Sequence, residues 1–134
     1  MRYNDSDGPQ GELILRTLAM PADTNANGDI FGGWIMSQMD IAGGILAKEV
    51  ANSRTVTVAA ESIQFIRAVH VGDVVCCYGR IVHTGNTSMK INLEVWVKPI
   101  LREHEDKTSR FKVTEAAFTY VAIDESGNKQ LIRR

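Results

Sequence analysis

Residues 23–33 read DTNANGDIFGG, and residues 34–47, which follow directly, read WIMSQMDIAGGILA. The first segment consists almost wholly of turn-forming residues, whereas the second is almost wholly apolar or small, as in a helix buried on most sides. Asp40 is the only ionisable residue of the second segment. Because burying a carboxylate costs free energy unless it is paired or hydrogen-bonded, Asp40 is a candidate functional residue.

The bulk properties are those of one ordinary globular domain. The chain has 134 residues, 44% hydrophobic and 23% charged, with a net charge of -1. This charge balance gives no reason to expect nucleic acid as a partner, and no apolar run is long enough for a membrane span. The only cysteines, Cys76 and Cys77, are neighbours and form a poor disulfide pair, which favours two buried thiols in a reducing cytoplasm. No cysteine or histidine spacing indicates a metal site.

Hydrophobic periodicity predicts an α+β fold. A helix is expected over residues 32–51, with Ile35, Met39, Leu46 and Val50 at helical spacing. Strands are expected over 12–20, 54–58 with its continuation over 61–65, 74–83, 87–97 and 110–123, with a hairpin tip at Gly85-Asn86. Hairpin-type links would join the later strands into an antiparallel sheet that wraps the helix. We expect a sheet edge to be hidden by pairing with a second copy of the chain.

The helix start and Asp40 together are suited to acyl chemistry. A helix N-terminus carries unsatisfied N–H groups, and the N–H of Gly32 could stabilise an oxyanion. Asp40 could act as general base or as nucleophile, and Asn25 could orient a water molecule. Gly32 and Asp40 are eight positions apart, about 12 Å along a helix. Both groups must reach one carbonyl, so the site is expected to combine two subunits.

Ordinary structural roles explain several of these residues equally well. Asp23, Asn27 and Asp29 are expected to be turn or N-cap residues, and a buried aspartate can be a structural hydrogen-bond anchor. The three histidines, His70, His83 and His104, are distant from the segment in sequence and have no serine or cysteine partner suggestive of a triad.

Three segments together resemble a known family. Residues 15–40, with the pattern Asn-x-x-Gly-x-x-x-Gly-Gly, residues 71–78 (VGDVVCCY) and residues 94–98 (EVWVK) are similar to the YciA-type acyl-CoA thioesterases of the hotdog fold. The similarity covers roughly residues 11–124. It implies a long central helix wrapped by a five- to six-stranded antiparallel sheet, paired into a dimer and assembled as a trimer of dimers, a homohexamer. Residues 1–10 would then be a flexible lead and residues 125–134 a polar tail.

The resemblance also implies a catalytic set. Asn25 stands at the place of the family's catalytic asparagine, Gly32 where a backbone N–H polarises the thioester carbonyl, and Asp40 at the acidic catalyst, with the asparagine and the acid on opposite subunits. The implied activity is hydrolysis of acyl-CoA to a free acid and coenzyme A in cytoplasmic fatty acid metabolism. No further cofactor is implied, because coenzyme A is part of the substrate.

Substrate contacts are less well marked in the sequence. Ala68 stands where the family commonly has proline, and Asn86-Thr87-Ser88 stands where related enzymes often carry an arginine for the coenzyme A phosphates. The candidates for substrate binding are Gly33, Thr57, Arg67, Ser88 and Lys90. Two other functions remain open: a thioester dehydratase or hydratase, although no histidine precedes Val69, and a non-catalytic acyl-CoA-binding module.

Overall fold

The computed structural model describes residues 8–102 and 109–132 as one helix against one sheet. In chain order the elements are β1 (Glu12–Leu18), a short 3-10 turn η2 (Pro21–Asp23), α1 (Gly32–Ala51), β2 (Arg54–Phe65), β3 (Val74–Thr84), β4 (Ser88–Lys98) and β5 (Phe111–Ile123). The predicted α+β class and helix bounds are confirmed. Among the described residues, no helix is both long and apolar enough to cross a bilayer.

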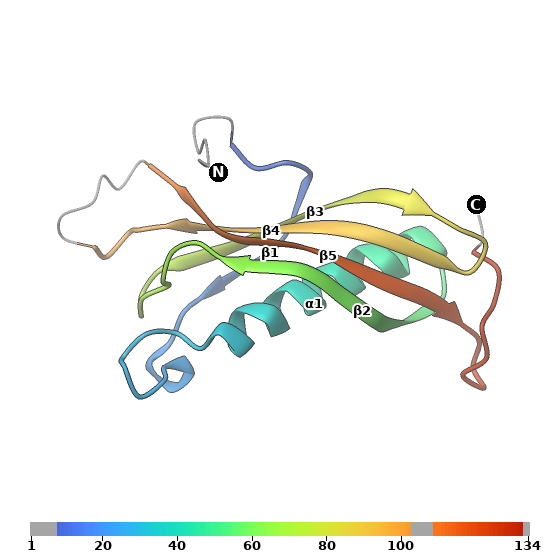
Figure 1. The fold of residues 1–134 in the computed structure, drawn as a ribbon, viewed down its shortest axis with the longest axis horizontal. Helices are drawn as coiled ribbons and strands as arrows, with labels where there is room; N and C mark the ends of the chain where they lie inside the picture. Colours follow the sequence, from blue (N-terminus) through green and yellow to red (C-terminus); the bar gives the residue numbers. More distant parts are fainter. Residues whose placement is uncertain (1–7, 103–108, 133–134) are drawn as a thin grey trace.

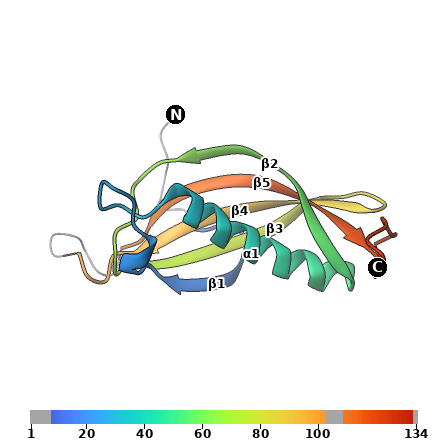
Figure 2. The same ribbon diagram turned by 90° about the horizontal axis from the view of Figure 1, so that it is seen from below.

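The five strands form a single antiparallel sheet in the order β1-β3-β4-β5-β2. The two views show α1 lying along one face of this sheet (Figures 1 and 2). The predicted hairpin of β3 and β4 is confirmed, and its tip is closed by a hydrogen bond from Gly85 N–H to the carbonyl of Ser88 at 2.8 Å. The expectation of hairpin-type links throughout is wrong, because β2 lies beside β5 at the far edge and does not pair with β3.

Strand β2 runs as one strand through both predicted segments, 54–58 and 61–65, and through the gap between them. The gap is bridged by irregular pairing with β5, where the register shifts between Thr57 and Ala59 and again between Glu61 and Gln64. Ser62 adopts a left-handed φ of 60° within the second irregularity. Such bulges bend a strand without ending it. The outer edge of β2 pairs with no described strand, and two of its large apolar side chains, Val56 and Val58, are 41% and 55% exposed.

Helix α1 meets the sheet closely because of one glycine. Gly43 faces the ring of Tyr120 on β5, and a Cβ at Gly43 would lie only 2.8 Å from the ring atom Cζ.

Ile35, Met39 and Leu46 are buried as their spacing predicts, whereas Val50 is 37% exposed. The helix ends at a left-handed residue, Asn52, whose N–H bonds the carbonyl of Lys48. This ending is a common way to stop a helix.

Both cysteine thiols lie in the interior, and the C-terminal tail lies beside the hairpin tip. Cys76 and Cys77 are both buried and free, and burial followed by the neighbouring Cys76 raises the pKa of Cys77 from 9.0 to about 12. The tail folds back on the hairpin tip, where Ile132 donates its N–H to Asn86 at 2.8 Å. Most of the predicted lead (residues 1–7) and the segment 103–108 between β4 and β5 lie outside the described residues.

Candidate active site

Asp40 is held by two hydroxyl groups that meet at one oxygen. Thr57 Oγ1 donates to Asp40 Oδ1 at 2.6 Å, and the Tyr120 hydroxyl lies 3.0 Å from the same oxygen and 3.1 Å from the main-chain carbonyl of Asp40. Thr57 and Tyr120 are direct cross-strand partners on β2 and β5. Among the described residues none donates to Oδ2, so one carboxylate oxygen is fixed while the other is left for a further partner.

The tyrosine is suited to remain a donor. Burial, then the charge of Asp40 and its hydrogen bond, raise the pKa of Tyr120 above its ordinary value of 10.0. The phenol is therefore protonated at neutral pH and keeps its hydrogen for donation. Sequence reasoning missed Tyr120, although the alternation of β5 places it on the core face between Phe118 and Ala122. A polar group at an inward position is the signal that could have identified it.

Asp40 faces a hollow lined by residues of α1, β2 and β5. The hollow has a volume of about 260 Å³. Its lining residues are Asp40, Ile41, Gly44, Ile45, Lys48, Thr55, Thr57 and Tyr120. Asp40 is half-buried, so it is both anchored and open to the hollow. The arrangement combines a structural anchor with an available carboxylate oxygen, and Thr57 lies in the hollow where sequence reasoning expects a substrate groove.

The start of α1 is not capped by a side chain. Phe31 is the N-cap residue and makes no side-chain hydrogen bond to the helix. Asp23, Asn27 and Asp29 are therefore turn residues of the preceding loop, one of the two roles predicted for them, and none of them caps α1; Asp23 accepts from the N–H of Met20 at 3.2 Å. The first N–H groups of a helix have no intrahelical partner, so those of Gly32 and Gly33 are available to an acceptor. A Cβ at Gly33 would touch nothing within 4 Å.

Asn25 organises the loop before the helix. Its side-chain oxygen accepts from the N–H groups of Asn27 at 2.9 Å and Asp29 at 3.2 Å, and its own N–H donates to the carbonyl of Asp29 at 2.7 Å. Two backbone donors on Oδ1 fix the orientation of the amide. Nδ2 has no acceptor among the described residues, so the side chain is presented as a donor. The sequence predicts that Asn25 orients a water by both donating and accepting hydrogen bonds. Its Oδ1 is already occupied by the two loop N–H groups, so only donation from Nδ2 remains for that role.

One chain does not bring these groups together. Neither Asn25 nor Gly32 lines the hollow at Asp40, and the helical spacing of Gly32 from Asp40 corresponds to about 12 Å. The described histidines, His70 and His83, are exposed and do not line it either, and His104 lies outside the described residues. The predicted catalytic residues are therefore not assembled around one hollow within a single chain.

The predicted phosphate-binding residues lie away from the hollow. The Lys90 ammonium forms an ion pair with Glu61 at 2.6 Å, and Arg67 stacks over the Phe111 ring at 3.6 Å from its centroid. Ser88 lies at the base of the β3–β4 hairpin. Their role in substrate binding therefore stays a prediction that depends on how subunits assemble.

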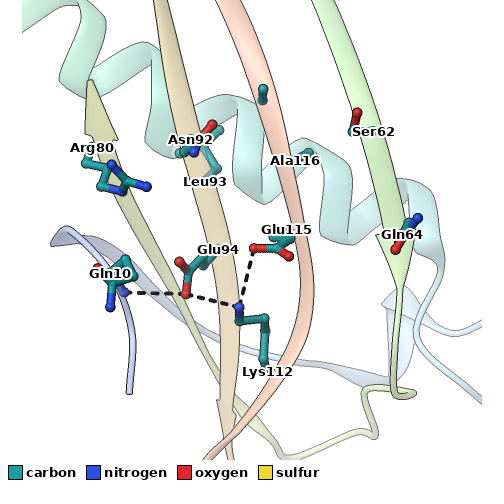
Figure 3. Close-up of a pocket in the computed structure, with 11 residues that line it drawn as sticks. Gln10, Ser62, Gln64, Arg80, Asn92, Leu93, Glu94, Lys112, Glu115 and Ala116 are labelled. Atoms are coloured by element: carbon teal, nitrogen blue, oxygen red, sulfur yellow. Dashed lines mark hydrogen bonds and ion pairs between the residues drawn. The ribbon is translucent and has the colours of Figure 1, made fainter. Parts of the chain in front are cut away.

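A second, larger hollow lies over the sheet and is shown in Figure 3. It has a volume of about 540 Å³ and includes Glu94, Lys112 and Glu115. The Lys112 ammonium lies 3.3 Å from Glu115 and 3.8 Å from Glu94, and Glu94 also accepts from the indole N–H of Trp96 at 2.9 Å. These charges satisfy one another, so the hollow at Asp40 is the better candidate for chemistry.

Comparison with known proteins identifies the family. A family model described as the thioesterase superfamily matches residues 27–103. The acyl-CoA thioester hydrolase YciA of Salmonella typhimurium is 66% identical over 119 residues, covering 89% of this chain and 88% of the relative. The same-named protein of Escherichia coli K12 is 62% identical over 124 residues, covering 92% of each.

Solved structures give the same answer. A hexameric thioesterase from Yersinia pestis superposes with a TM-score of 0.87 at 57% identity, covering 94% of this chain and 98% of the other. A hexameric hotdog fold thioesterase of Campylobacter jejuni gives a TM-score of 0.85 at 41% identity, covering 92% and 91%. The helix, the sheet and the sequence all agree with these proteins, so the chain belongs to the thioesterase superfamily and, within it, to the hotdog-fold acyl-CoA thioester hydrolases of the YciA type.

Proposed function

We propose that the protein hydrolyses acyl-CoA thioesters to a free carboxylic acid and coenzyme A at a site shared by two subunits. The observation that carries this proposal is the geometry of Asp40, whose Oδ1 is fixed by Thr57 and Tyr120 while Oδ2 is left for the hollow. A carboxylate held in this way can accept a proton without losing its orientation. The names of the relatives supply the substrate class.

In the proposed reaction the thioester carbonyl accepts a hydrogen bond from the N–H of Gly32 of the partner subunit. Water attacks the carbonyl carbon while Asp40 Oδ2 accepts the water proton, and the carbonyl electrons move onto the oxygen near that N–H. Collapse of the tetrahedral intermediate breaks the carbon–sulfur bond, and the proton returns from Asp40 to the leaving thiolate. Asn25 of the partner subunit donates from Nδ2 to the water or to the thioester. Direct attack by Asp40, giving a mixed anhydride, is the alternative pathway.

The proposed dimer places two such sites symmetrically. Val56 and Val58 on the open β2 edge, with Ile41 and Ile45 beside the hollow, are the exposed apolar surface that a second copy would cover. Three such dimers would give the hexamer described for the relatives. In that assembly Arg67, Ser88 and Lys90 are the proposed contacts for the coenzyme A phosphates, and Gly33 adds a second helix-start N–H. We place the activity in cytoplasmic fatty acid metabolism, where two free thiols would stay reduced.

Asp40→Asn tests the proposal directly. The amide keeps the shape and accepts the same two hydrogen bonds at Oδ1, but it cannot take a proton, so turnover should fall about 100-fold or more. Release of coenzyme A from several acyl-CoAs is followed with a thiol reagent. Glu49→Gln, an exposed carboxylate on the same helix, should leave turnover unchanged. Hydrolysis at the wild-type rate by folded Asp40→Asn would reject the mechanism, and a protein that releases no thiol from any acyl-CoA would favour hydratase chemistry or simple binding.

A further inference from the structure

A buried ion pair lies behind the loop that carries Asn25. Arg102 donates from Nε to Asp73 Oδ1 at 3.1 Å and from a terminal nitrogen to Asp73 Oδ2 at 2.7 Å. The side chains of Asp73 and Arg102 are 1% and 12% exposed. Such a pair is weak evidence for stability, because desolvation cancels much of the attraction, so its position calls for another explanation.

The pair closes the turn formed by residues 68–73. Arg102 also donates to the main-chain carbonyl of Ala68 at 3.0 Å, and Asp73 Oδ2 accepts from the N–H of His70 at 2.8 Å. The N–H of Asp73 returns to the carbonyl of His70 at 3.0 Å. The two charges therefore fix both ends of this turn, which we name the 68–73 turn.

The 68–73 turn in turn holds both ends of the loop that carries Asn25. At the first end, the N–H of Ala19 donates to the carbonyl of Asp73 at 3.0 Å and the N–H of Gly72 donates to the carbonyl of Ala19 at 2.8 Å. At the second end, the N–H of Ile30 donates to the carbonyl of Val69 at 3.1 Å. Ala19, Ile30 and Val69 are all buried. The loop is therefore anchored at its two ends on one small support.

The support reaches Asn25 through Asp29. His70 Nε2 lies 4.0 Å from Asp29 Oδ1, and Asp29 is the residue that exchanges backbone and side-chain hydrogen bonds with Asn25. Ile30 also leads directly into the first turn of α1. A displacement of the 68–73 turn would move both the Asn25 amide and the N–H of Gly32. Misplacement by about 1 Å can cost a reaction about 100-fold.

We infer that Asp73 and Arg102 are positioning residues, which set Asn25 and the start of α1 in place for the reaction in the partner subunit's hollow. The inference rests on the proposed function. It differs from a purely structural role because it predicts that the pair affects catalysis through Asn25, beyond any effect on the folded state.

A double-mutant cycle tests the inference. Arg102→Gln should lower kcat about 10-fold or more with a smaller change in KM, whereas in the Asn25→Ala background the same substitution should lower kcat by a clearly smaller factor, because only the part that acts through the N–H of Gly32 remains. Arg110→Gln, which removes another arginine over an aromatic ring, should leave kcat unchanged. Equal losses in both backgrounds, or full kcat in folded Arg102→Gln, would overturn the inference. If Arg102→Gln does not fold, Arg102→Lys and the neutral pair Asp73→Asn/Arg102→Gln take its place in the cycle.

Hydrogen exchange gives a readout that does not depend on activity. Arg102→Gln should weaken amide protection over residues 20–31 while leaving the middle of α1 protected. Unchanged protection of that loop would overturn the inference. Full activity of both Asn25→Ala and Asp40→Asn would instead reject the proposed function, and the exchange result would still decide whether the pair holds the loop.

Discussion

At the scale of single residues, the site depends on a hydroxyl group that sequence motifs did not identify. Tyr120 touches Asp40 twice, at the carboxylate and at the main-chain carbonyl, so it links the proposed general base to the sheet. Thr57 completes the pair from the neighbouring strand. Orientation of a general base by fixed donors is a large part of how a rigid site accelerates a reaction.

Tyr120→Phe should separate this orienting role from packing. The ring stays in place against Gly43 but the donor is lost, so kcat should fall about 10-fold, the size expected for losing one hydrogen bond to a charged group. Tyr78→Phe is the matched control, because the Tyr78 hydroxyl makes no hydrogen bond with the described residues. The measurement is steady-state hydrolysis with thermal unfolding alongside. A kcat for Tyr120→Phe equal to that of Tyr78→Phe would show that Thr57 alone is sufficient.

Cys77 makes a prediction about alkaline stability. Burial raises the pKa of Cys77 from 9.0 to about 12 in the folded protein, while the unfolded thiol ionises near its ordinary value. Above pH 9 the unfolded chain loses the Cys77 proton while the folded protein still holds it, so ionisation favours unfolding. The stabilisation from the buried neutral thiol is therefore complete below pH 9, and it is lost as pH rises towards 12 by up to about 1.4 kcal/mol per pH unit. Denaturant titrations between pH 8 and 10 should show a steeper decline for the wild type than for Cys77→Ala. Parallel declines would contradict the assignment.

At the scale of elements, the adjacent glycines Gly43 and Gly44 of α1 differ in whether the structure has room for a side chain. A Cβ at Gly43 would collide with the Tyr120 ring, whereas a Cβ at Gly44 would meet nothing within 4 Å. Gly43→Ala should therefore destabilise the fold by about 1–3 kcal/mol through overpacking. Gly44→Ala should be neutral or stabilising by up to about 1 kcal/mol from helix propensity. Chemical denaturation of both variants checks this, and a larger loss at Gly44 would contradict the packing argument.

The same helix shows which features could be predicted from sequence. Its bounds, Gly32–Ala51, follow from turn residues before it and a change of period after it, which are local signals. The pairing of β2 with β5 could not be predicted in this way, because strand partners are chosen by tertiary packing across distant parts of the chain. Asp40 was identifiable as a lone acid among apolar residues. Tyr120 and the Asp73–Arg102 pair were not, since their partners lie far away in sequence.

At the scale of the whole molecule, the two groups of predicted site residues do not meet within one chain. The start of α1, with Asn25 nearby, lies on one side, and Asp40 lies further along the helix at its own hollow. A two-fold axis would bring the start of α1 and Asn25 of one subunit to Asp40 of its partner. The same axis would create a second, identical site at the other end of the dimer. The exposed apolar residues on β2 and beside the hollow are the surface on which this pairing would act.

Mixing two inactive variants tests this arrangement. In a dimer of Asp40→Asn with Asn25→Ala, one site carries both substitutions while the other combines the intact Asp40 with the intact Asn25, so activity should return. Random exchange of equal amounts makes about half of the dimers mixed, with one intact site in two, so about a quarter of wild-type activity is expected. Co-refolding the variants and measuring coenzyme A release gives the value. Each variant refolded alone provides the baseline. If the mixture shows only the sum of the two baselines although subunits have exchanged, Asp40 and Asn25 act within one chain and the shared site is wrong.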